Sequence, residues 1–259
     1  MTDRSSVHHA AAIGFGAAAE AYQHARPDYP AALADWLRDE LGLAPGKVVV
    51  DLGAGTGKFT PFLHATGARG VAVEPVEAMR AELVAAHPDV EALAGEAERL
   101  PLADASVDAI VCAQSFHWFA KPAALAEMRR ALKPGGALGL VWNVRDARVA
   151  WVAALTRILD HYQGDAPRHE SGQWRALFPA PGFTPLSERR FAYEHVGPPE
   201  RIIVERALSV SFIAALPADE QARVADEMRA LIAATPSLAG RATVAFPYVT
   251  HAYACRRRD

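Results

Sequence analysis

Two kinds of hydrophobic pattern alternate along the first part of this chain. Continuous apolar runs rich in β-branched residues predict buried strands. They begin at Val48 and recur at residues 70–74, 107–113 and 137–142, and a short strand is expected near 90–94. Between these runs, apolar residues recur every three or four positions, as on the buried face of a helix. Strands that alternate with helices in this way predict a doubly wound, mostly parallel α/β sheet.

The same periodicity predicts where the helices lie. One helix follows Pro30 and ends before Gly42, and the next three lie at 57–66, around Val76 to Leu83, and at 122–132. From residue 143 onward the alternation is lost. The elements expected there are a helix at 148–163, a strand at 185–196, helices at 199–215 and 217–234, and a last strand at 244–255.

A glycine-rich turn joins the first strand to the helix after it. The residues read Asp51-Leu52-Gly53-Ala54-Gly55-Thr56-Gly57-Lys58, an acid followed by three alternating glycines. Glycine adopts positive φ at little cost and leaves space for a ligand beside the backbone. The helix that follows directs unpaired N–H groups at whatever occupies the turn. The turn therefore predicts a nucleotide-type site.

Two familiar nucleotide motifs fit this turn poorly. A phosphate-binding P-loop would need a glycine at Leu52 and a hydroxyl at Phe59, so we reject it. The dinucleotide fingerprint G-x-G-x-x-G would need a third glycine where Lys58 stands. The carboxylate of Asp51 would repel a pyrophosphate but suits a ligand that carries an ammonium group.

The segment from Asp51 to Gly57 resembles motif I of class I S-adenosylmethionine (SAM)-dependent methyltransferases. Glu74 ends the next strand, about twenty residues beyond the turn, where such folds place an acid on the ribose hydroxyls. Glu74 would also suit NAD, so it supports adenosine binding rather than SAM alone. Residues 95–102 resemble a further methyltransferase motif, which implies that Glu96 faces the adenine amine and the backbone of Ala97 faces the ring.

The resemblance implies the fold, the domains and a set of cofactor-binding residues. It implies a seven-stranded Rossmann-like sheet that ends in an antiparallel hairpin and carries a helical cap insertion. We therefore expect a lid segment at 1–30, a SAM-binding core at 31–145, and a cap with the closing strands at 146–259. The residues expected to bind SAM are Asp51, Gly53, Ala54, Gly55, Thr56, Gly57, Glu74, Pro75, Met79, Glu96, Ala97, Gln114, Tyr22 and Arg26.

The N-terminal lead-in supplies the last two of these residues. The segment from Tyr22 to Pro30 resembles the lead-in of a small-molecule methyltransferase subset, where it folds over the SAM pocket. Alternatively, it is a proline-stiffened linker that docks its aromatic side chains on the domain. Both interpretations place Tyr22 near the mouth of the site, and we expect residues 1–25 to become ordered when the cofactor binds.

The acceptor is expected to bind after the fourth strand, where Ser115, His117, Trp118 and Phe119 follow Gln114. An Asn/Asp-Pro-Pro-aromatic motif, which DNA and protein amide methyltransferases carry here, is absent. The residues present resemble methyltransferases of the trans-aconitate and quinone-biosynthesis type. His117 is a candidate general base or orienting group, and Trp118 is a candidate for cation–π contact with the sulfonium. Alternatively, His117 bonds to backbone while both aromatic residues are core.

Composition excludes several partners. The 259 residues carry a net charge of −3 and a pI near 6.4, which give no general attraction to nucleic acid or membrane. Cys112 and Cys255 fall in apolar runs and are expected to be buried thiols in a reducing, cytoplasmic compartment. No apolar run reaches the ~18 residues of a membrane span, and no basic region precedes an apolar leader. The histidines show no metal-ligand spacing.

The sequence thus predicts a cytoplasmic SAM-dependent methyltransferase that acts on a small molecule. A carboxylate, a phenol or quinol, and a carbon acid all remain candidate acceptors, and a homodimer is left open. A non-catalytic SAM-binding module is the first alternative. A nicotinamide-dependent oxidoreductase is the second, and Lys58 in the fingerprint argues against it.

Overall fold

The computed structural model describes residues 26–164 and 167–259. The expectations for Tyr22 and for ordering of residues 1–25 lie outside these ranges. Within them, no helix is long and apolar enough to cross a membrane.

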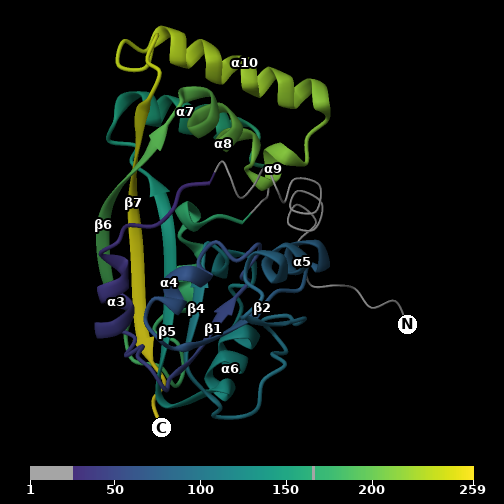
Figure 1. Cartoon of the computed structure of the whole chain (residues 1–259), viewed down its shortest axis with the longest axis vertical. Helices are drawn as coiled ribbons and strands as arrows, with labels where there is room; N and C mark the ends of the chain where they lie inside the picture. The colour runs from purple at the N-terminus through teal and green to yellow at the C-terminus, as the bar shows by residue number, and fades with distance from the viewer. Residues whose placement is uncertain (1–25, 165–166) are drawn as a thin grey trace.

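A seven-stranded sheet forms the centre of the described chain (Figure 1). Its strands lie in the order β3-β2-β1-β4-β5-β7-β6. Strands β1 to β5 pair in parallel, whereas β7 runs antiparallel to both β5 and β6. The bounds are β1 Val48–Leu52, β2 Arg69–Val73, β3 Glu91–Leu93, β4 Val107–Ala113, β5 Leu132–Arg145, β6 Ser187–Gly197 and β7 Val244–Arg256. The predicted fold class is therefore confirmed, including the C-terminal antiparallel hairpin.

Helices cover both faces of the parallel half of the sheet, because alternate side chains of each strand point to opposite faces. Val50 of β1 packs in one core cluster with Leu125 of α6, while Val49 packs in another with Leu37 of α3 and Leu63 of α4. The helices of this half are α3 Leu33–Asp39, α4 Thr60–His64, α5 Glu77–Ala86 and α6 Pro122–Ala131.

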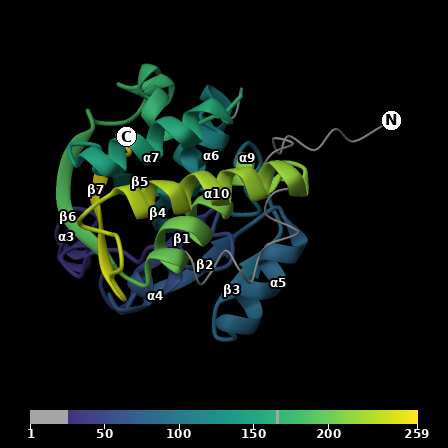
Figure 2. The same cartoon turned by 90° about the horizontal axis from the view of Figure 1, so that it is seen from above.

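The second half of the chain forms a helical layer at one end of the sheet. Strands β5, β6 and β7 extend beyond the parallel core toward this layer, and α10 lies across its top (Figures 1 and 2). Trp151, Ile203 and Met228 from three of its helical segments share one apolar cluster with Phe246 of β7. The segments are α7 Ala150–His161, a π-helical turn Glu200–Glu205, α8 Arg206–Leu208, α9 Ser211–Ala214 and α10 Ala218–Ala234.

Three elements differ clearly from the sequence prediction in extent. Helix α4, Thr60–His64, covers only the middle of the helix predicted at 57–66. Strand β5 begins at Leu132 rather than 137, because Leu132 pairs with Val107 and the register then shifts before Ala109 pairs with Ala137. The helix predicted at 199–215 is broken into short pieces, with Val210 in an extended conformation before α9. At the break, the Ser209 hydroxyl donates a hydrogen bond to the Arg206 carbonyl at 2.8 Å.

Candidate active site

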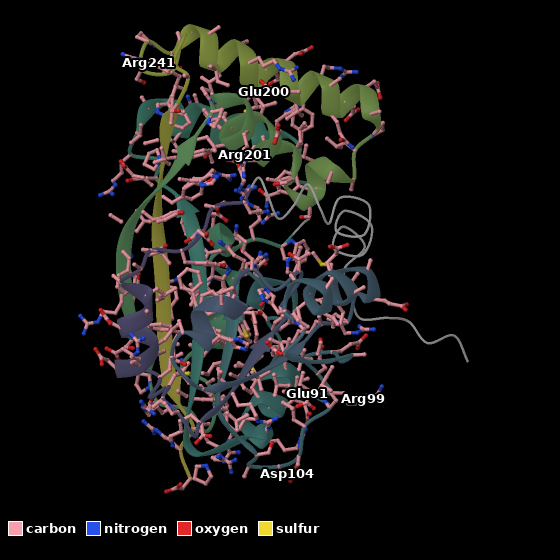
Figure 3. The ribbon with its side chains drawn as sticks, viewed as in Figure 1. Glu91, Arg99, Asp104, Glu200, Arg201 and Arg241 are labelled. Atoms are coloured by element: carbon pink, nitrogen blue, oxygen red, sulfur yellow. The ribbon has the colours of Figure 1, made fainter. Side chains whose placement is uncertain are left out.

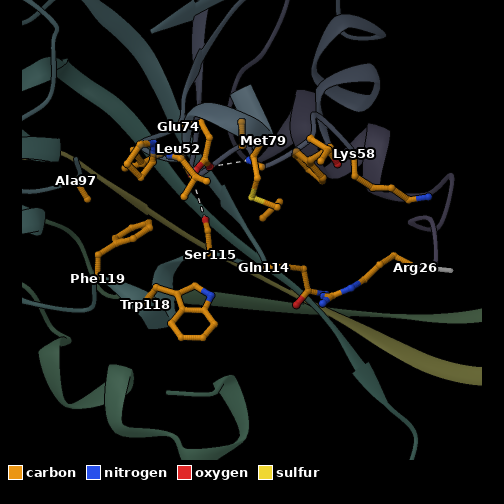
Figure 4. Close-up of a pocket in the computed structure, with 18 of the residues that line it drawn as sticks. Arg26, Leu52, Lys58, Glu74, Met79, Ala97, Gln114, Ser115, Trp118 and Phe119 are labelled. Atoms are coloured by element: carbon orange, nitrogen blue, oxygen red, sulfur yellow. Dashed lines mark hydrogen bonds between the residues drawn. The ribbon is translucent and has the colours of Figure 1, made fainter. Parts of the chain in front are cut away.

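A cleft opens at the carboxyl ends of the parallel strands, where open α/β sheets bind ligands (Figure 4). Leu52 ends β1, Glu74 follows β2, and Gln114 follows β4 directly. Arg206 of α8 reaches the same cleft from the helical layer. The predicted residues that line it are Arg26, Gly53, Ala54, Gly55, Thr56, Glu74, Pro75, Met79, Glu96, Ala97, Gln114, Ser115, Trp118 and Phe119.

The three glycines of the turn have different surroundings, although all have positive φ. Apart from its chain neighbours, the described atom nearest to a Cβ on Gly55 would be Met79 Cε at 3.7 Å, so the described residues leave the space beside Gly55 open to a ligand. A Cβ on Gly53 would lie 2.7 Å from Ser115 Cβ, and one on Gly57 would lie 2.6 Å from His87 Cδ2. Gly53 and Gly57 therefore make room for neighbouring parts of the protein, and Gly57 does not line the cleft.

Glu74, directly after β2, forms a hydrogen bond to the glycine turn. Its Oε2 accepts a hydrogen bond from the Gly55 N–H at 2.9 Å, and its Oε1 accepts one from the Val76 N–H at 2.9 Å. The side chain is only 5% exposed, and burial raises the pKa of its carboxyl despite these two bonds. An ionised carboxylate has about four acceptor sites. Glu74 therefore retains acceptor capacity for hydroxyl groups in the cleft.

The chain after β4 folds back over the turn because Gln114 adopts a left-handed conformation, with φ of 58°. The Gln114 N–H still donates to the Val141 carbonyl at 2.8 Å, and the Ser115 hydroxyl donates to the Leu52 carbonyl at 2.7 Å (Figure 4). A left-handed residue other than glycine costs roughly 1–2 kcal/mol, so the surrounding contacts must hold it in place. This conformation brings Trp118 and Phe119 into the wall of the cleft.

Asp51 lies behind the turn instead of lining the cleft, and it is 2% exposed. Its Oδ2 accepts a hydrogen bond from the Thr60 hydroxyl at 3.0 Å, while its Oδ1 is buried without a hydrogen-bond partner among the described residues. Burial raises the pKa of Asp51 to about 7; the Thr60 bond opposes this shift, and the nearby charge of Glu74 adds to it. A buried acid with an unsatisfied oxygen fits a ligand that brings positive charge to this turn.

The raised pKa of Asp51 predicts a pH-dependent difference in stability. The folded state favours the neutral form of Asp51. The contribution of this residue to the free energy of unfolding is therefore fully present below the ordinary aspartate pKa of 3.8, and it is lost as pH rises toward about 7. We expect Asp51→Asn to melt about 4 °C or more above wild type at about pH 8 without ligand, and nearer to wild type at about pH 5.

Differential scanning calorimetry of both proteins at the two pH values measures this effect. Asp35→Asn, which changes an exposed acid of α3, serves as the control and should show no such trend. A constant offset between Asp51→Asn and wild type across this pH range would contradict the pKa assignment.

A second hollow adjoins the cleft and contains His117. Arg26, Gln114, Trp118, Asn143 and Arg206 line both spaces. The second hollow is otherwise lined by His117, Trp142, Val144, Arg145, Pro167, Arg168, His169, Glu170, Val210, Ser211 and Phe212. The two hollows therefore form neighbouring compartments with a shared wall.

His117 is held as a neutral imidazole in this second hollow. Its Nδ1 accepts a hydrogen bond from the Trp142 indole N–H at 3.1 Å, rather than bonding to backbone. Burial lowers the pKa of His117 to about 3, so the ring is uncharged and weakly basic at neutral pH. Its place next to Trp142 supports a role in lining the hollow, and its role as a general base stays a hypothesis.

Sequence reasoning missed several polar residues of the two hollows. Asn143 and Arg145 lie at the end of β5, directly after the predicted strand 137–142. The rule that ligands bind at the carboxyl ends of strands could have found both residues. This rule could not have found Arg206, because Arg206 lies in the broken helical region and does not follow a strand. Fold and cleft together are those of an α/β protein with a nucleoside-type site.

The chain is similar in sequence to known methyltransferases. Residues 50–140 match the methyltransferase domain family. A methyltransferase-like protein of Schizosaccharomyces pombe is 38% identical over 237 residues, which cover 91% of this chain and 92% of that protein. A methyltransferase of Mycobacterium tuberculosis is 40% identical over 238 residues, which cover 92% of this chain and 93% of its own.

A solved structure described as a type II methyltransferase from Anaeromyxobacter dehalogenans agrees in fold, with a TM-score of 0.64 and 27% identity over 90% of this chain and 97% of that one. The chain therefore belongs to the class I SAM-dependent methyltransferases. Its expected resemblance to the trans-aconitate and quinone-biosynthesis type stays a prediction.

Proposed function

We propose that this enzyme binds SAM in the cleft over the glycine turn and transfers its methyl group to a small-molecule acceptor by in-line displacement. The main observation behind this proposal is that the cleft and the second hollow share a wall. Gln114, Trp118 and Arg206 line both the cleft and the second hollow, so a donor in one can meet an acceptor in the other.

The residues of the cleft suit the parts of SAM in order. Glu74 has acceptor capacity for the ribose hydroxyls, and Glu96 and Ala97 line the cleft beyond β3, where the adenine would lie. Asp51 behind the turn offers negative charge to the amino group and sulfonium at the other end. Tyr22 and the ordering of residues 1–25 remain part of this proposal.

Methyl transfer requires little acid–base chemistry from the protein. SAM supplies a methyl group on a sulfonium, a leaving group that is already activated. The protein residues therefore mainly align the acceptor and exclude water, and Trp118 offers an aromatic face to the positive charge. A neutral, weakly basic His117 suits an acceptor that is already an anion at neutral pH, because such an acceptor needs no general base.

The acceptor is proposed to be a small molecule rather than nucleic acid or a membrane component. The hollow beside the cleft is lined by side chains of β5, α8 and α9, and the net charge of the chain is −3. Carboxylates, phenols or quinols, and carbon acids all remain within this proposal. Cytoplasmic location and a homodimer stay predictions.

The test combines ligand-induced stabilisation with turnover. At about 100 times its dissociation constant, S-adenosylhomocysteine (SAH) should add about 2.7 kcal/mol to the free energy of unfolding, whereas NADH should add none. Release of SAH from SAM should then depend on one member of a panel of acids, phenols and quinols. Stabilisation by NADH in place of SAH, or SAH binding without turnover on any acceptor class, would contradict the proposal.

A further inference from the structure

We propose that Arg145 and Arg206 form an anion-binding subsite that anchors a carboxylate or phosphate group of the acceptor, away from the atom that is methylated. The inference rests on the proposed function, because it assigns the substrate class of the hollow beside the cofactor cleft. Neither of these two cationic side chains forms an ion pair with a carboxylate in the described part of the chain, and the Nε atom of each is buried without a hydrogen-bond partner there.

Arg145 lies at the end of β5, opposite Tyr248 of β7. Its guanidinium makes no hydrogen bond or ion pair with the described residues, and its Nε is buried. Burial lowers the pKa of Arg145 to about 10; the charge of Glu170 opposes this shift, and the charges of Arg206 and Arg168 add to it. Burying a cation costs free energy unless a group of opposite charge binds next to it.

Arg206 begins α8 and lines the cofactor cleft, the second hollow and a narrow gap next to it. Its Nε is also buried without a partner among the described residues, and its Nη1 donates a long hydrogen bond to the Ser209 hydroxyl at 3.4 Å. Tyr248 lines the same gap as both arginines, and its hydroxyl is buried without a partner in the described chain. Three side chains with unused donors thus meet at one place.

Cationic side chains outnumber carboxylates in the lining of the second hollow. Arg26, Arg145, Arg168 and Arg206 line it, whereas Glu170 is the one carboxylate that does so in the described part of the chain. Glu170 lies 3.4 Å from Arg168 Nε. Burial opposes its ionisation, but Arg168 and Arg145 outweigh that effect and hold the pKa of Glu170 at about 2. Arg168 also forms an ion pair with Asp160 at 2.6 Å, so it engages both carboxylates. Arg145 and Arg206 form no ion pair with a carboxylate in the described part of the chain.

Arginines on the outer surface contrast with Arg145 and Arg206. Asp104 and Glu200, labelled in Figure 3, form ion pairs with Arg130 at 2.7 Å and with Arg229 at 2.6 Å. The chain as a whole is acidic, with a net charge of −3. The positive charge of this hollow is therefore a local feature. Guanidinium groups suit carboxylates and phosphates because they donate two parallel hydrogen bonds.

The position of the two arginines defines the shape of the acceptor. Arg145 lines the second hollow and the gap beyond it but not the cofactor cleft, while Gln114 and Trp118 form the wall toward the cleft. An anion bound by Arg145 therefore lies away from the cofactor. The acceptor is an elongated small molecule with its anionic group at one end and its nucleophilic atom at the other.

Calorimetric titration of the full-length protein, saturated with SAH, tests this subsite. The probes are benzoate, glutarate and phenyl phosphate, with methyl benzoate and dimethyl glutarate as uncharged counterparts. At least one anion should bind, and its ester should bind at least about tenfold more weakly. Whether carboxylates or phenyl phosphate bind more tightly identifies the anchored group. Failure of all three anions to bind, or equal binding of acid and ester, would overturn the proposal.

Three variants locate the anion. Arg145→Gln and Arg206→Gln should each weaken the bound probe by at least about tenfold. Arg148→Gln is the matched control, because Arg148 follows the same strand but is exposed and pairs with Asp146 at 2.7 Å. It should bind the probe as wild type does. Equal binding by all three variants would contradict the assignment to Arg145 and Arg206.

A stability measurement separates this inference from misfolding and from failure of the proposed function. Arg145→Gln removes a buried charge that has no ion-pair partner in the described chain, so its melting temperature should equal or exceed that of wild type. Its SAH affinity should stay within about twofold of wild type. If wild type fails to bind SAH, the proposed function fails. If wild type binds SAH and Arg145→Gln binds the anionic probe as tightly as wild type does, only the assignment of the anion subsite is wrong.

Discussion

Gly55→Val is expected to reduce SAH binding below detection while the protein still folds. The described residues leave open space where the Cβ of residue 55 would lie, since the nearest of their atoms outside the turn is Met79 Cε at 3.7 Å. In the proposed complex the cofactor fills that space, so the valine side chain would occupy the position of the ligand. The positive φ of residue 55 adds strain of roughly 1–2 kcal/mol, which lowers the melting temperature without unfolding the domain.

Gly46→Val is the matched control for this strain. Gly46 has φ of 85°, and apart from its chain neighbours no atom of the described residues lies within 4 Å of the position that a Cβ would occupy there. The residue lies in the turn before β1, outside the cleft. This variant should lose similar stability yet bind SAH as wild type does in isothermal titration calorimetry. Normal SAH binding by Gly55→Val would mean that the cofactor does not lie over this turn.

Glu74→Ala is expected to weaken SAH binding by about 1–3 kcal/mol, the usual cost of losing charge-assisted hydrogen bonds. The loss has two sources: residue 74 no longer accepts a hydrogen bond from the Gly55 N–H at 2.9 Å, and it no longer offers an acceptor to the ribose hydroxyls of the proposed complex. Glu91→Ala is the control, because Glu91 lies on the neighbouring strand but pairs with Arg69 on the surface at 3.1 Å (Figure 3). Equal SAH affinities of Glu74→Ala and wild type in the same calorimetric titration would remove Glu74 from the cofactor site.

Much of the fold can be predicted from the sequence, because parallel strands that are buried on both faces of the sheet appear as continuous apolar runs. The run at 107–113 is almost wholly apolar, and β4 has the same bounds. The glycine turn is equally clear, since positive φ at Gly53 and Gly55 favours glycine in the sequence itself. The antiparallel hairpin that closes the sheet, by contrast, is implied by the family resemblance rather than by the pattern, and the strand order comes from the structure alone.

The acceptor side could not be predicted in the same way, because its residues meet only in three dimensions. Arg145 and Arg206 are far apart in the chain, and the short pieces around the break at Val210 resemble one continuous helix in their periodicity. The bond between His117 and Trp142 likewise depends on the packing of η1, the turn Phe116–Trp118, against β5. Periodicity reports which residues are buried, but not which buried polar groups find partners.

The crystal structure of the full-length protein with bound SAH tests the central claim most directly. The account predicts SAH over Gly55, with its ribose hydroxyls on Glu74, its adenine beside Ala97, and its sulfur facing Gln114 and Trp118 toward the hollow that contains Arg145. SAH bound elsewhere, or bound with its sulfur directed away from that hollow, would contradict the account.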